Sequence, residues 1–549
     1  MASFPAYSGA RPKPAPKAPR RDGGSIWRPF ARRLFVAIWI AALVSNLGTW
    51  MQNVGAAWLM TSLAPSPLMV SLIQTAASLP IFLLALPAGA LADVLDRRRL
   101  LIFAQAWMLV AAGVLGVLTI RNEITPALLL TFSFLLGVGA ALGAPAWQAI
   151  IPEIVERDEL APAIALNGIN FNLARAVGPA LGGVVVAMLG AGATFILNAL
   201  SFLGVIAVLY AWKRSHRPGV LPAERVMGAM RAGLRYVRYA PPLRAVLMRT
   251  AALMAGAAAM WAILPLIARE QLGLGASGYG GLLAAFGVGA VAGGALMSTI
   301  DRAISRDAAV GCATVALALM TGALGWLHSL LLAHLAMALG GAGWVIAMSE
   351  LNVAAQLAVP QWVQGRALAC YQIVLQGGLA LMSIGWGAVA ESIGIAWAMT
   401  LAAAALLVSL AAGIRWRIDA IGEIAMDLAP PVPAPPADGA IDHDAGPVLV
   451  SVEFLIDPEQ ALEFESAMYD LRTVRRRDGA TFWGLFVDAA DTRRYVEYFV
   501  VDTWIEHLRQ HERATLADQD VLDRARSFHR GEGPPAVAHR IAASGRDRG

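Results

Sequence analysis

The sequence predicts an all-α membrane protein with twelve transmembrane helices in two repeated six-helix halves, followed by a small C-terminal α+β domain. Composition indicates the class, because 58% of the 549 residues are hydrophobic and only 15% are charged. A soluble protein carries roughly 25% charged residues. Long apolar runs recur as far as residue 415, and a helix needs about 20 apolar residues to cross a bilayer.

Pro, Gly and charged residues divide these runs into separate spans. The expected spans are 34–60, 68–92, 100–120, 127–149, 162–188, 192–212, 245–269, 278–300, 308–327, 330–354, 366–390 and 395–415. Lys and Arg gather in alternate connections, and eight of them lie in the first 33 residues. Because basic residues favour the cytoplasmic side, we expect a bacterial inner-membrane protein with both termini in the cytoplasm.

Two short matches indicate that the halves are duplicated. Gly89–Leu91 recurs as Gly294–Leu296, an offset of 205, and the loop that begins at Pro152 recurs at Pro360, an offset of 208. Parallel repeats of this kind place a substrate site between the halves near the midplane. The expected units are a disordered basic tail (1–33), the first half (34–212), a cytoplasmic linker (213–244), the second half (245–417), a Pro-rich linker (418–446) and the α+β domain (447–545).

The connection after the second span has the features of a latch between the halves. Gly89 allows close approach of two helices, and Asp93 ends its helix where the helix dipole disfavours an anion. We expect Asp93 and Arg97 to bind the opposite half near Arg366 and to release it during a conformational change. The alternative is a charge cluster that only sets membrane orientation.

The fifth span contains Gly178, Pro179, Gly182 and Gly183. A proline kinks a membrane helix and frees a carbonyl group, and the glycines permit tight packing against the other half. We therefore expect a kinked seam that acts as a gate or prevents leakage.

Charged residues inside spans are costly unless they face a cavity or a partner. Arg175 lies near the middle of the fifth span, and it either binds an anionic group of a substrate, balances a proton-carrying acid or belongs to a buried structural ion pair. Glu350 is the candidate coupling carboxylate, with an interfacial acid at a helix end as the alternative.

Amides and tryptophans supply the remaining candidate site residues. Some amides are expected to line a central cavity and others to join helices: Asn46, Gln52, Asn53, Asn170, Gln372 and Gln376. Four tryptophans are candidates for apolar walls, although anchoring at the membrane interface is the commoner role of Trp: Trp50, Trp58, Trp261 and Trp344. Such a cavity suits amphiphilic organic molecules better than small ions.

Several segments together resemble one family. Residues 89–98 are similar to the signature of the major facilitator superfamily, although Asp96 stands where the common pattern has Gly. Residues 45–52, 57–61, 172–183 and 363–367 resemble its enterobactin-exporter-like branch. The resemblance implies alternating access, a latch at residues 89–98 and proton-driven export of siderophores or other small molecules, with the proton gradient as the energy source and no cofactor.

After residue 447 the pattern changes to βαββαβ, with strands at 448–456, 481–487, 494–501 and 536–541, and this order indicates a ferredoxin-like unit. It resembles the dimeric domains related to antibiotic-biosynthesis monooxygenases, which implies possible self-association. His507 and His511 are four residues apart on a helix, but no third ligand shows comparable spacing. A solvated helix face is therefore expected, with neither a metal site nor catalytic residues.

Other classes of function are disfavoured. The net charge of +5 lies at membrane-flanking positions, so we expect the lipid bilayer, a small-molecule substrate and protons as partners, and not nucleic acid. No GxxxxGK[ST] loop that would bind ATP is present, and Cys312 and Cys370 indicate no disulfide framework. The alternative function is a membrane-tethered enzyme or sensor that acts through the C-terminal domain.

Overall fold

The computed structural model describes residues 26–156, 158–212, 235–419, 421, 426, 429 and 441–543. Most of the expected basic tail and of the two expected linkers therefore lies outside the described residues. Twelve helices in the described ranges are long and apolar enough to cross a membrane, which confirms the expected number of spans. They are α1 (Arg33–Leu63), α2 (Pro67–Val94), α3 (Arg97–Ile120), α4 (Pro126–Ile154), α5 (Leu160–Leu189), α6 (Ala191–Ala211), α8 (Pro241–Leu266, continued by Ile267–Gln271), α9 (Ala276–Ala303), α10 (Arg306–Leu324), α11 (Leu330–Leu357), α12 (Gln364–Ile393) and α13 (Ile395–Arg415).

Local sequence explains where these helices begin and end. The side chains of Ser66, Asp96 and Ser305 accept a hydrogen bond from the first turns of α2, α3 and α10, as N-cap residues do. Gly190 and Gly394 join α5 to α6 and α12 to α13 with φ of 81° and 88°. This left-handed backbone is open to glycine at little cost, so both pairs of helices turn back sharply.

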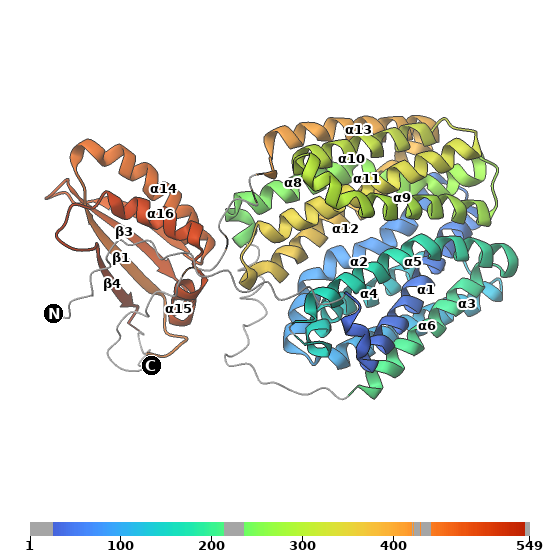
Figure 1. The fold of residues 1–549 in the computed structure, drawn as a ribbon, viewed down its shortest axis with the longest axis horizontal. Coiled ribbons are helices and arrows are strands. Elements are labelled where there is room, and N and C mark those ends of the chain that lie inside the picture. The colour runs from blue at the N-terminus through green and yellow to red at the C-terminus, as the bar shows by residue number, and fades with distance from the viewer. Residues whose placement is uncertain are drawn as a thin grey trace, which may run out of the picture.

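The helices form two groups of six, α1–α6 and α8–α13, which lie side by side in Figure 1. The groups meet along two helix pairs, α2 with α12 and α5 with α9. Small residues bring helices together within a group. A methyl group on Gly341 would overlap the backbone oxygen of Phe286, so α11 and α9 are in backbone contact, as membrane helices with small residues often are.

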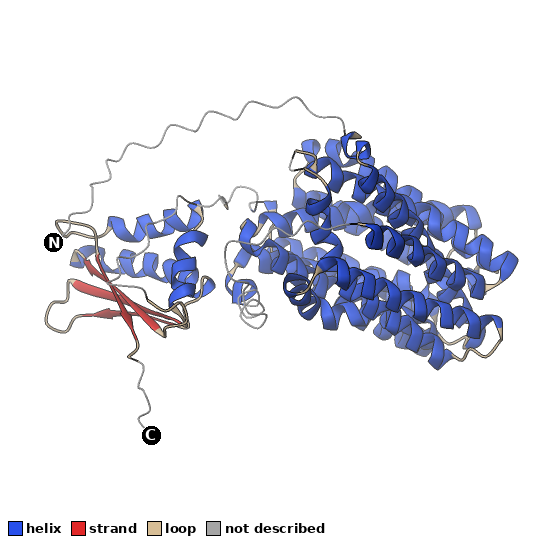
Figure 2. Ribbon diagram, turned by 90° about the horizontal axis from the view of Figure 1, so that it is seen from below, coloured by secondary structure: helices blue, strands red, loops and turns tan. Residues whose placement is uncertain are grey.

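The C-terminal domain is a four-stranded antiparallel sheet with helices packed on it. Its elements are β1 (Val448–Leu455), α14 (Ala461–Arg477), β2 (Phe482–Val487), β3 (Arg494–Val501), α15 (Trp504–Arg513), α16 (Leu516–Ser527) and β4 (Ala536–Ile541). The strand order is β2-β3-β1-β4, and the helices lie on one face of the sheet (Figure 2). The strands agree with the expected positions within one residue at each end.

Alternation along the strands explains which face is covered. Val448, Val450 and Phe454 of β1 are buried under the helices with Phe464 of α14. Because side chains of a strand alternate between faces, the intervening residues of β1 point to the uncovered face.

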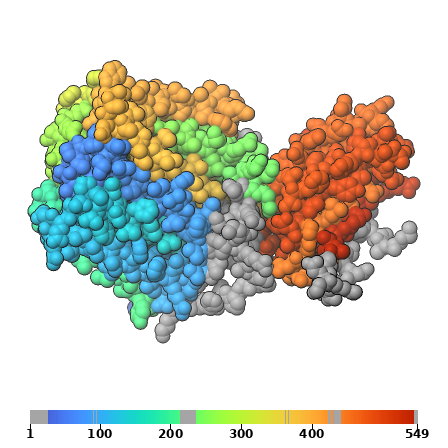
Figure 3. Space-filling model, turned by 180° about the vertical axis from the view of Figure 1, so that it is seen from behind, coloured from blue at the N-terminus to red at the C-terminus, as the bar shows by residue number. Residues whose placement is uncertain are grey.

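The C-terminal domain is a separate body beside one end of the helix bundle (Figure 3). We call this end of the bundle the near end and the opposite end the far end. Helix α15 contacts the near end, where Glu506 pairs with Arg235 at 3.0 Å and the Arg513 guanidinium lies 4.2 Å from the centroid of the Trp362 ring. The domain therefore touches the turn that precedes α12, a helix at the contact between the two groups.

Candidate functional site

The candidate site is centred on Arg175, which lies near the middle of α5 and is only 9% exposed. Its guanidinium carbon lies 5.2 Å from the ring centroid of Phe286, 5.9 Å from that of Trp261 and 5.8 Å from that of Trp344. The three rings belong to α9, α8 and α11. Arg175 thus extends from the first group of helices into an aromatic cage formed by the second.

The cage does not satisfy the hydrogen-bonding capacity of Arg175. Its Nε and Nη2 atoms are buried without a hydrogen-bond partner, and among the described residues no carboxylate pairs with it. The structure therefore does not show the buried ion pair that was one expectation for this residue. A cation over aromatic faces gains about 0.5–2 kcal/mol per contact, but an unsatisfied buried donor costs about 1–3 kcal/mol, more when charged.

Trp50 of α1 extends the aromatic cage. Its ring centroid lies 6.3 Å from that of Trp261, which in turn lies 5.7 Å from that of Trp344. Trp261 and Trp344 thus surround Arg175, and Trp50 lies behind them against Trp261. Trp58, the fourth, stacks on Tyr279 with centroids 6.1 Å apart.

The glycines of α5 place Arg175 between the two groups. A methyl group on Gly178 would lie 2.6 Å from the Trp50 Cβ atom, and one on Gly182 would lie 2.8 Å from the Met51 Cα atom, both in α1. On Gly183 it would lie 2.7 Å from the Ala276 carbonyl oxygen in α9. The Pro179 oxygen faces Gly280 of α9. Pro179 and Gly183 thus face the other group, whereas Gly178 and Gly182 pack on α1 of their own group and not, as expected, against the other half.

The candidate amides divide into two kinds. Asn46 donates to Asn170 at 3.0 Å, Asn170 donates to the carbonyl oxygen of Trp39 at 2.7 Å, and Gln52 accepts from Asn198 at 2.7 Å. These three candidates join α1 to α5 and α6 within the first group.

By contrast, Asn53 and Gln372 are exposed, and Gln376 is half-buried. They lie on α1 and α12, one helix from each group. Amides of this kind remain available to a ligand.

Glu350 is buried in α11, where its Oε2 atom lies 3.7 Å from Nε of Arg306 at the start of α10. The pair lies toward the near end of the bundle, away from Arg175. Glu350 is therefore part of a partly buried ion pair and is not brought to the aromatic cage.

The structure describes only part of the expected latch. Arg97 binds Glu153 of α4, in its own group, at 2.9 Å. A methyl group on Gly89 would meet nothing within 4 Å, so Gly89 makes no close contact with another helix among the described residues. The side chains of Asp93 and Arg366 lie outside the described residues.

Hydrogen bonds between the groups occur from mid-depth to the far end. Glu391 of α12 accepts from the Ser66 hydroxyl at 2.7 Å, and Thr75 donates to the Ala380 carbonyl at 2.8 Å. Arg269 donates to the hydroxyl groups of Thr61 and Ser62 at 2.9 and 2.7 Å. These bonds close the far end of the bundle.

Sequence reasoning missed Phe286, which lies inside the expected span 278–300, and Glu391, which lies one residue beyond the expected span 366–390. It also missed the buried pair of Arg249 with Asp307, which joins α8 to α10. The charge of Arg249 inside the expected span 245–269 was a signal, but the partners of Arg249 and Glu391 come from distant segments.

Comparison with solved structures shows which fold this is. The fold resembles that of the transporter PepTSo of the POT family (11% identity, 70% of this chain and 97% of that chain, TM-score 0.60). It also resembles that of an inward-facing bacterial homologue of the iron transporter ferroportin (14% identity, 70% and 98%, TM-score 0.56). Twelve spans in two groups are therefore arranged in the fold of these membrane proteins.

The chain belongs to the transmembrane secretion effector family of major facilitator transporters, whose profile matches residues 24–547. A stretch of 164 residues is 29% identical to the staphyloferrin A transporter of Staphylococcus aureus, covering 30% of this chain and 41% of the relative. Another of 215 residues is 29% identical to the multidrug efflux pump Tap of Mycolicibacterium fortuitum, covering 38% and 53%. The matches thus span about half the length of these relatives. The protein is therefore a multi-pass membrane protein of this family.

Proposed function

We propose that this protein is a proton-coupled exporter of amphiphilic small molecules, siderophore-like compounds among them, that works by alternating access. The observation that carries the proposal is the buried guanidinium of Arg175, which has two unpartnered nitrogens in an aromatic cage between the helix groups. An amphiphile with a carboxylate or phenolate group fits both the guanidinium of Arg175 and the aromatic cage around it. The anion would satisfy the guanidinium, and the apolar part would pack on the rings.

The repeat of the halves, expected from sequence, gains support from helix packing. In the first group α1 packs on α5 and α6, α2 on α4, and α3 on α4 and α6. In the second group α8 packs on α12 and α13, α9 on α11, and α10 on α11 and α13. Corresponding helices therefore make corresponding contacts. Two helix groups of similar architecture, with the Arg175 site at the contact between them, are suited to rocking between an inward-open and an outward-open state.

The hydrogen bonds at the far end support an assignment of the conformational state of the bundle. With both termini in the cytoplasm, as the basic connections favour, the far end is the outer side and the structure is closed there. Arg97 then binds Glu153 instead of the opposite half because the latch belongs to the other, outward-open state. Asn53 and Gln372 would line the path to the site, since an exposed amide facing hydrocarbon is costly.

We place proton coupling at Glu350, whose burial beside Arg306 makes its charge sensitive to rearrangement of α10 and α11. The two relatives support the substrate class, because one is a siderophore transporter and the other a multidrug pump by name. Glu350→Gln is expected to abolish transport driven by a pH gradient while leaving exchange of substrate across the membrane intact.

Transport into proteoliposomes under an imposed pH gradient tests the proposal, with carboxylate and catecholate siderophores and cationic and neutral lipophilic dyes as substrates. We expect gradient-dependent movement of anionic amphiphiles in the wild type and its loss in Arg175→Ala. Arg121→Ala, which removes an exposed arginine at the end of α3, is the matched control and should transport normally. Equal transport by Arg175→Ala and wild type would refute the role of Arg175, and no gradient-dependent movement of any compound would refute the exporter function.

The C-terminal domain is proposed to self-associate. Its strand order is the order expected of a ferredoxin-like unit, and the uncovered sheet face carries Phe482 and Phe486, which are 47% and 50% exposed. Exposed apolar patches commonly mark interfaces. Replacing Phe482 and Phe486 by glutamate should shift the protein from dimer to monomer in nanodiscs, as counted by mass photometry. An unchanged fraction of dimer would show that the domains do not associate through this face of the sheet.

A further inference from the structure

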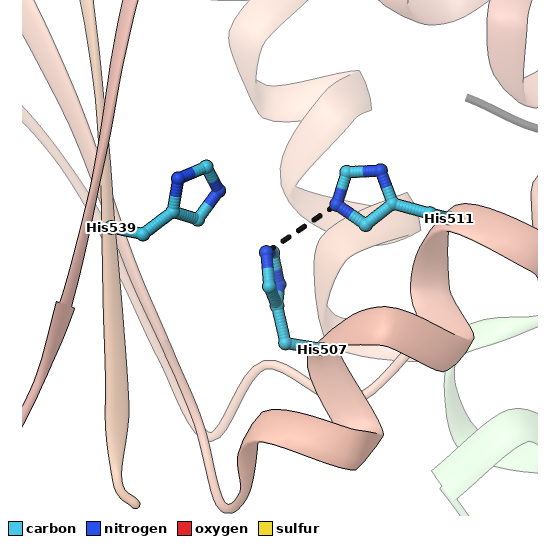
Figure 4. A group of neighbouring side chains, drawn as sticks. All are labelled: His507, His511 and His539. Atoms are coloured by element: carbon cyan, nitrogen blue, oxygen red, sulfur yellow. Dashed lines mark hydrogen bonds between the residues drawn. The ribbon is translucent and has the colours of Figure 1, made fainter. Parts of the chain in front are cut away.

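Three histidines of the C-terminal domain converge beside α15. His507 and His511 lie on one face of α15, and β4 brings His539 next to them (Figure 4). His507 is 2% exposed and the other two are half-buried, so the expectation of a solvated helix face is wrong. The spacing along the helix revealed only two of the three, because His539 is brought in by the pairing of β4 with β1, opposite the core residue Val450.

The spacing of the ring nitrogens is that of metal ligands. The Nε2 atoms of His507 and His511 are 3.3 Å apart, and two imidazole nitrogens bound at 2.0–2.1 Å to a tetrahedral ion are separated by about 3.3–3.4 Å. One nitrogen of each of the three rings lies within 4.8 Å of the others. Binding of all three to one ion would require a change in the His539 side-chain torsion that closes the remaining distance.

The surroundings orient the rings as a metal site requires. Nδ1 of His507 lies 3.3 Å from Oε1 of Gln510, and Gln510 in turn donates to the Asp478 carbonyl oxygen at 3.1 Å. With the Nδ1 proton directed to Gln510, Nε2 of His507 is free to bind, and metal-ligating histidines characteristically have such a partner. The Trp504 ring packs on His507 and His539, with centroids 5.6 and 6.3 Å away.

Charge at this position is compatible with a bound cation. Arg475 is the neighbouring basic group, and its guanidinium is paired with the buried carboxylate of Glu497 at 3.1 Å.

We propose that His507, His511 and His539 bind a divalent first-row transition-metal ion, with zinc as the reference metal. Imidazole ligands suit Zn²⁺, Cu²⁺, Ni²⁺ and Fe²⁺, and three protein ligands leave a coordination position for water or an exogenous ligand. The half-buried His511 and His539 permit exchange with solvent. This inference is independent of the proposed export activity.

The site lies on the helix that contacts the membrane bundle. His507 follows Glu506, which pairs with Arg235, and His511 lies two residues before Arg513, whose guanidinium covers Trp362. A bound ion would fasten α15 to β4 and so fix the helix that carries these contacts.

The test uses the full-length protein, purified through a tag without histidine, stripped with chelator and placed in nanodiscs. Co²⁺ is titrated while the visible d–d absorption band of the metal is recorded, and Zn²⁺ is then added as competitor. His511→Gln and His539→Gln remove one half-buried ligand each. His443→Gln removes an exposed histidine of the same domain and is the control.

We expect one Co²⁺ per chain in the wild type and in His443→Gln, displaced by Zn²⁺, and binding at least about 10-fold weaker in His511→Gln and His539→Gln. Gln510→Ala should weaken binding roughly 10-fold or more through the orientation of His507. Gel filtration and tryptophan fluorescence confirm that each variant is folded. A wild type without the absorption band, or folded ligand variants that bind as the wild type does, would overturn the proposal and leave a hydrogen-bonded histidine cluster.

Discussion

The guanidinium of Arg513 lies over the ring of Trp362, 4.2 Å from its centroid, and this contact joins the C-terminal domain to the membrane bundle. Trp362 lies in the short 3-10 turn Gln361–Val363, directly before α12. Helix α12 packs against α2 at the contact between the helix groups, so the C-terminal domain is held beside a helix of this contact.

Arg513→Ala is expected to loosen α15 from the bundle. A cation–π contact of this kind contributes about 1 kcal/mol, so amide hydrogen exchange in α15 and in residues 235–239 should become about 5-fold faster. Arg524→Ala, which removes an exposed arginine of α16, should leave exchange at these residues unchanged. Unchanged exchange in Arg513→Ala would mean that the other contacts hold the domain.

Replacing Arg175 should separate stability from function. Because its Nε and Nη2 atoms are buried and unpartnered, Arg175→Met removes a desolvation cost of about 1–3 kcal/mol while keeping much of the side-chain volume. We expect a higher melting temperature in detergent together with loss of transport. A lower melting temperature would show that the aromatic cage stabilises the cation by more than its desolvation costs.

Arg249 is buried to a similar extent as Arg175, but we expect its replacement to lower the stability of the protein. Its guanidinium is paired with Asp307, whose carboxylate also accepts from the backbone nitrogens of Ile418 and Asp419. Removing one member of a buried pair costs about 3–5 kcal/mol because the other charge stays unpaired. Arg249→Met should therefore lower stability in SDS unfolding titrations, and adding Asp307→Leu should restore part of it. Additive losses in the double variant would contradict a direct pairing.

Two glycines of α5 should respond differently to the same substitution. In Gly183→Ala the new methyl group would lie 2.7 Å from the backbone oxygen of Ala276, which cannot move cheaply, so closure of the far end should be impaired and transport reduced. Gly168→Ala meets nothing within 4 Å and should transport normally. Equal effects of the two would indicate that helix propensity, and not the contact between groups, matters at Gly183.

Much of the fold was predictable because a bilayer imposes one simple requirement along the chain. All twelve spans could be located from apolar runs, since each helix must satisfy its own backbone in hydrocarbon. The strands of the C-terminal domain followed from alternation of apolar residues and from turn residues. The unusual position of Arg175 was also evident from sequence, because a charge in the middle of a span is costly.

The partners of these residues could not be predicted in the same way. Asn170 and Gln52 were candidates for the cavity wall, yet they join helices of one group. Glu350 lies beside Arg306 and away from the aromatic cage. Each outcome depends on the rotation of a helix about its axis, which weakly amphipathic spans do not encode.

The sequence by itself determined the number of spans, the place of the buried cation and the positions of the strands, because hydropathy and local turn chemistry act on neighbouring residues. Only the tertiary structure decided that Phe286, Trp261 and Trp344 surround Arg175, and that His539 joins His507 and His511. Those groupings bring together residues from separate helices and strands. The packing of backbones at glycine contacts and the register of β4 on β1 set the distances between them.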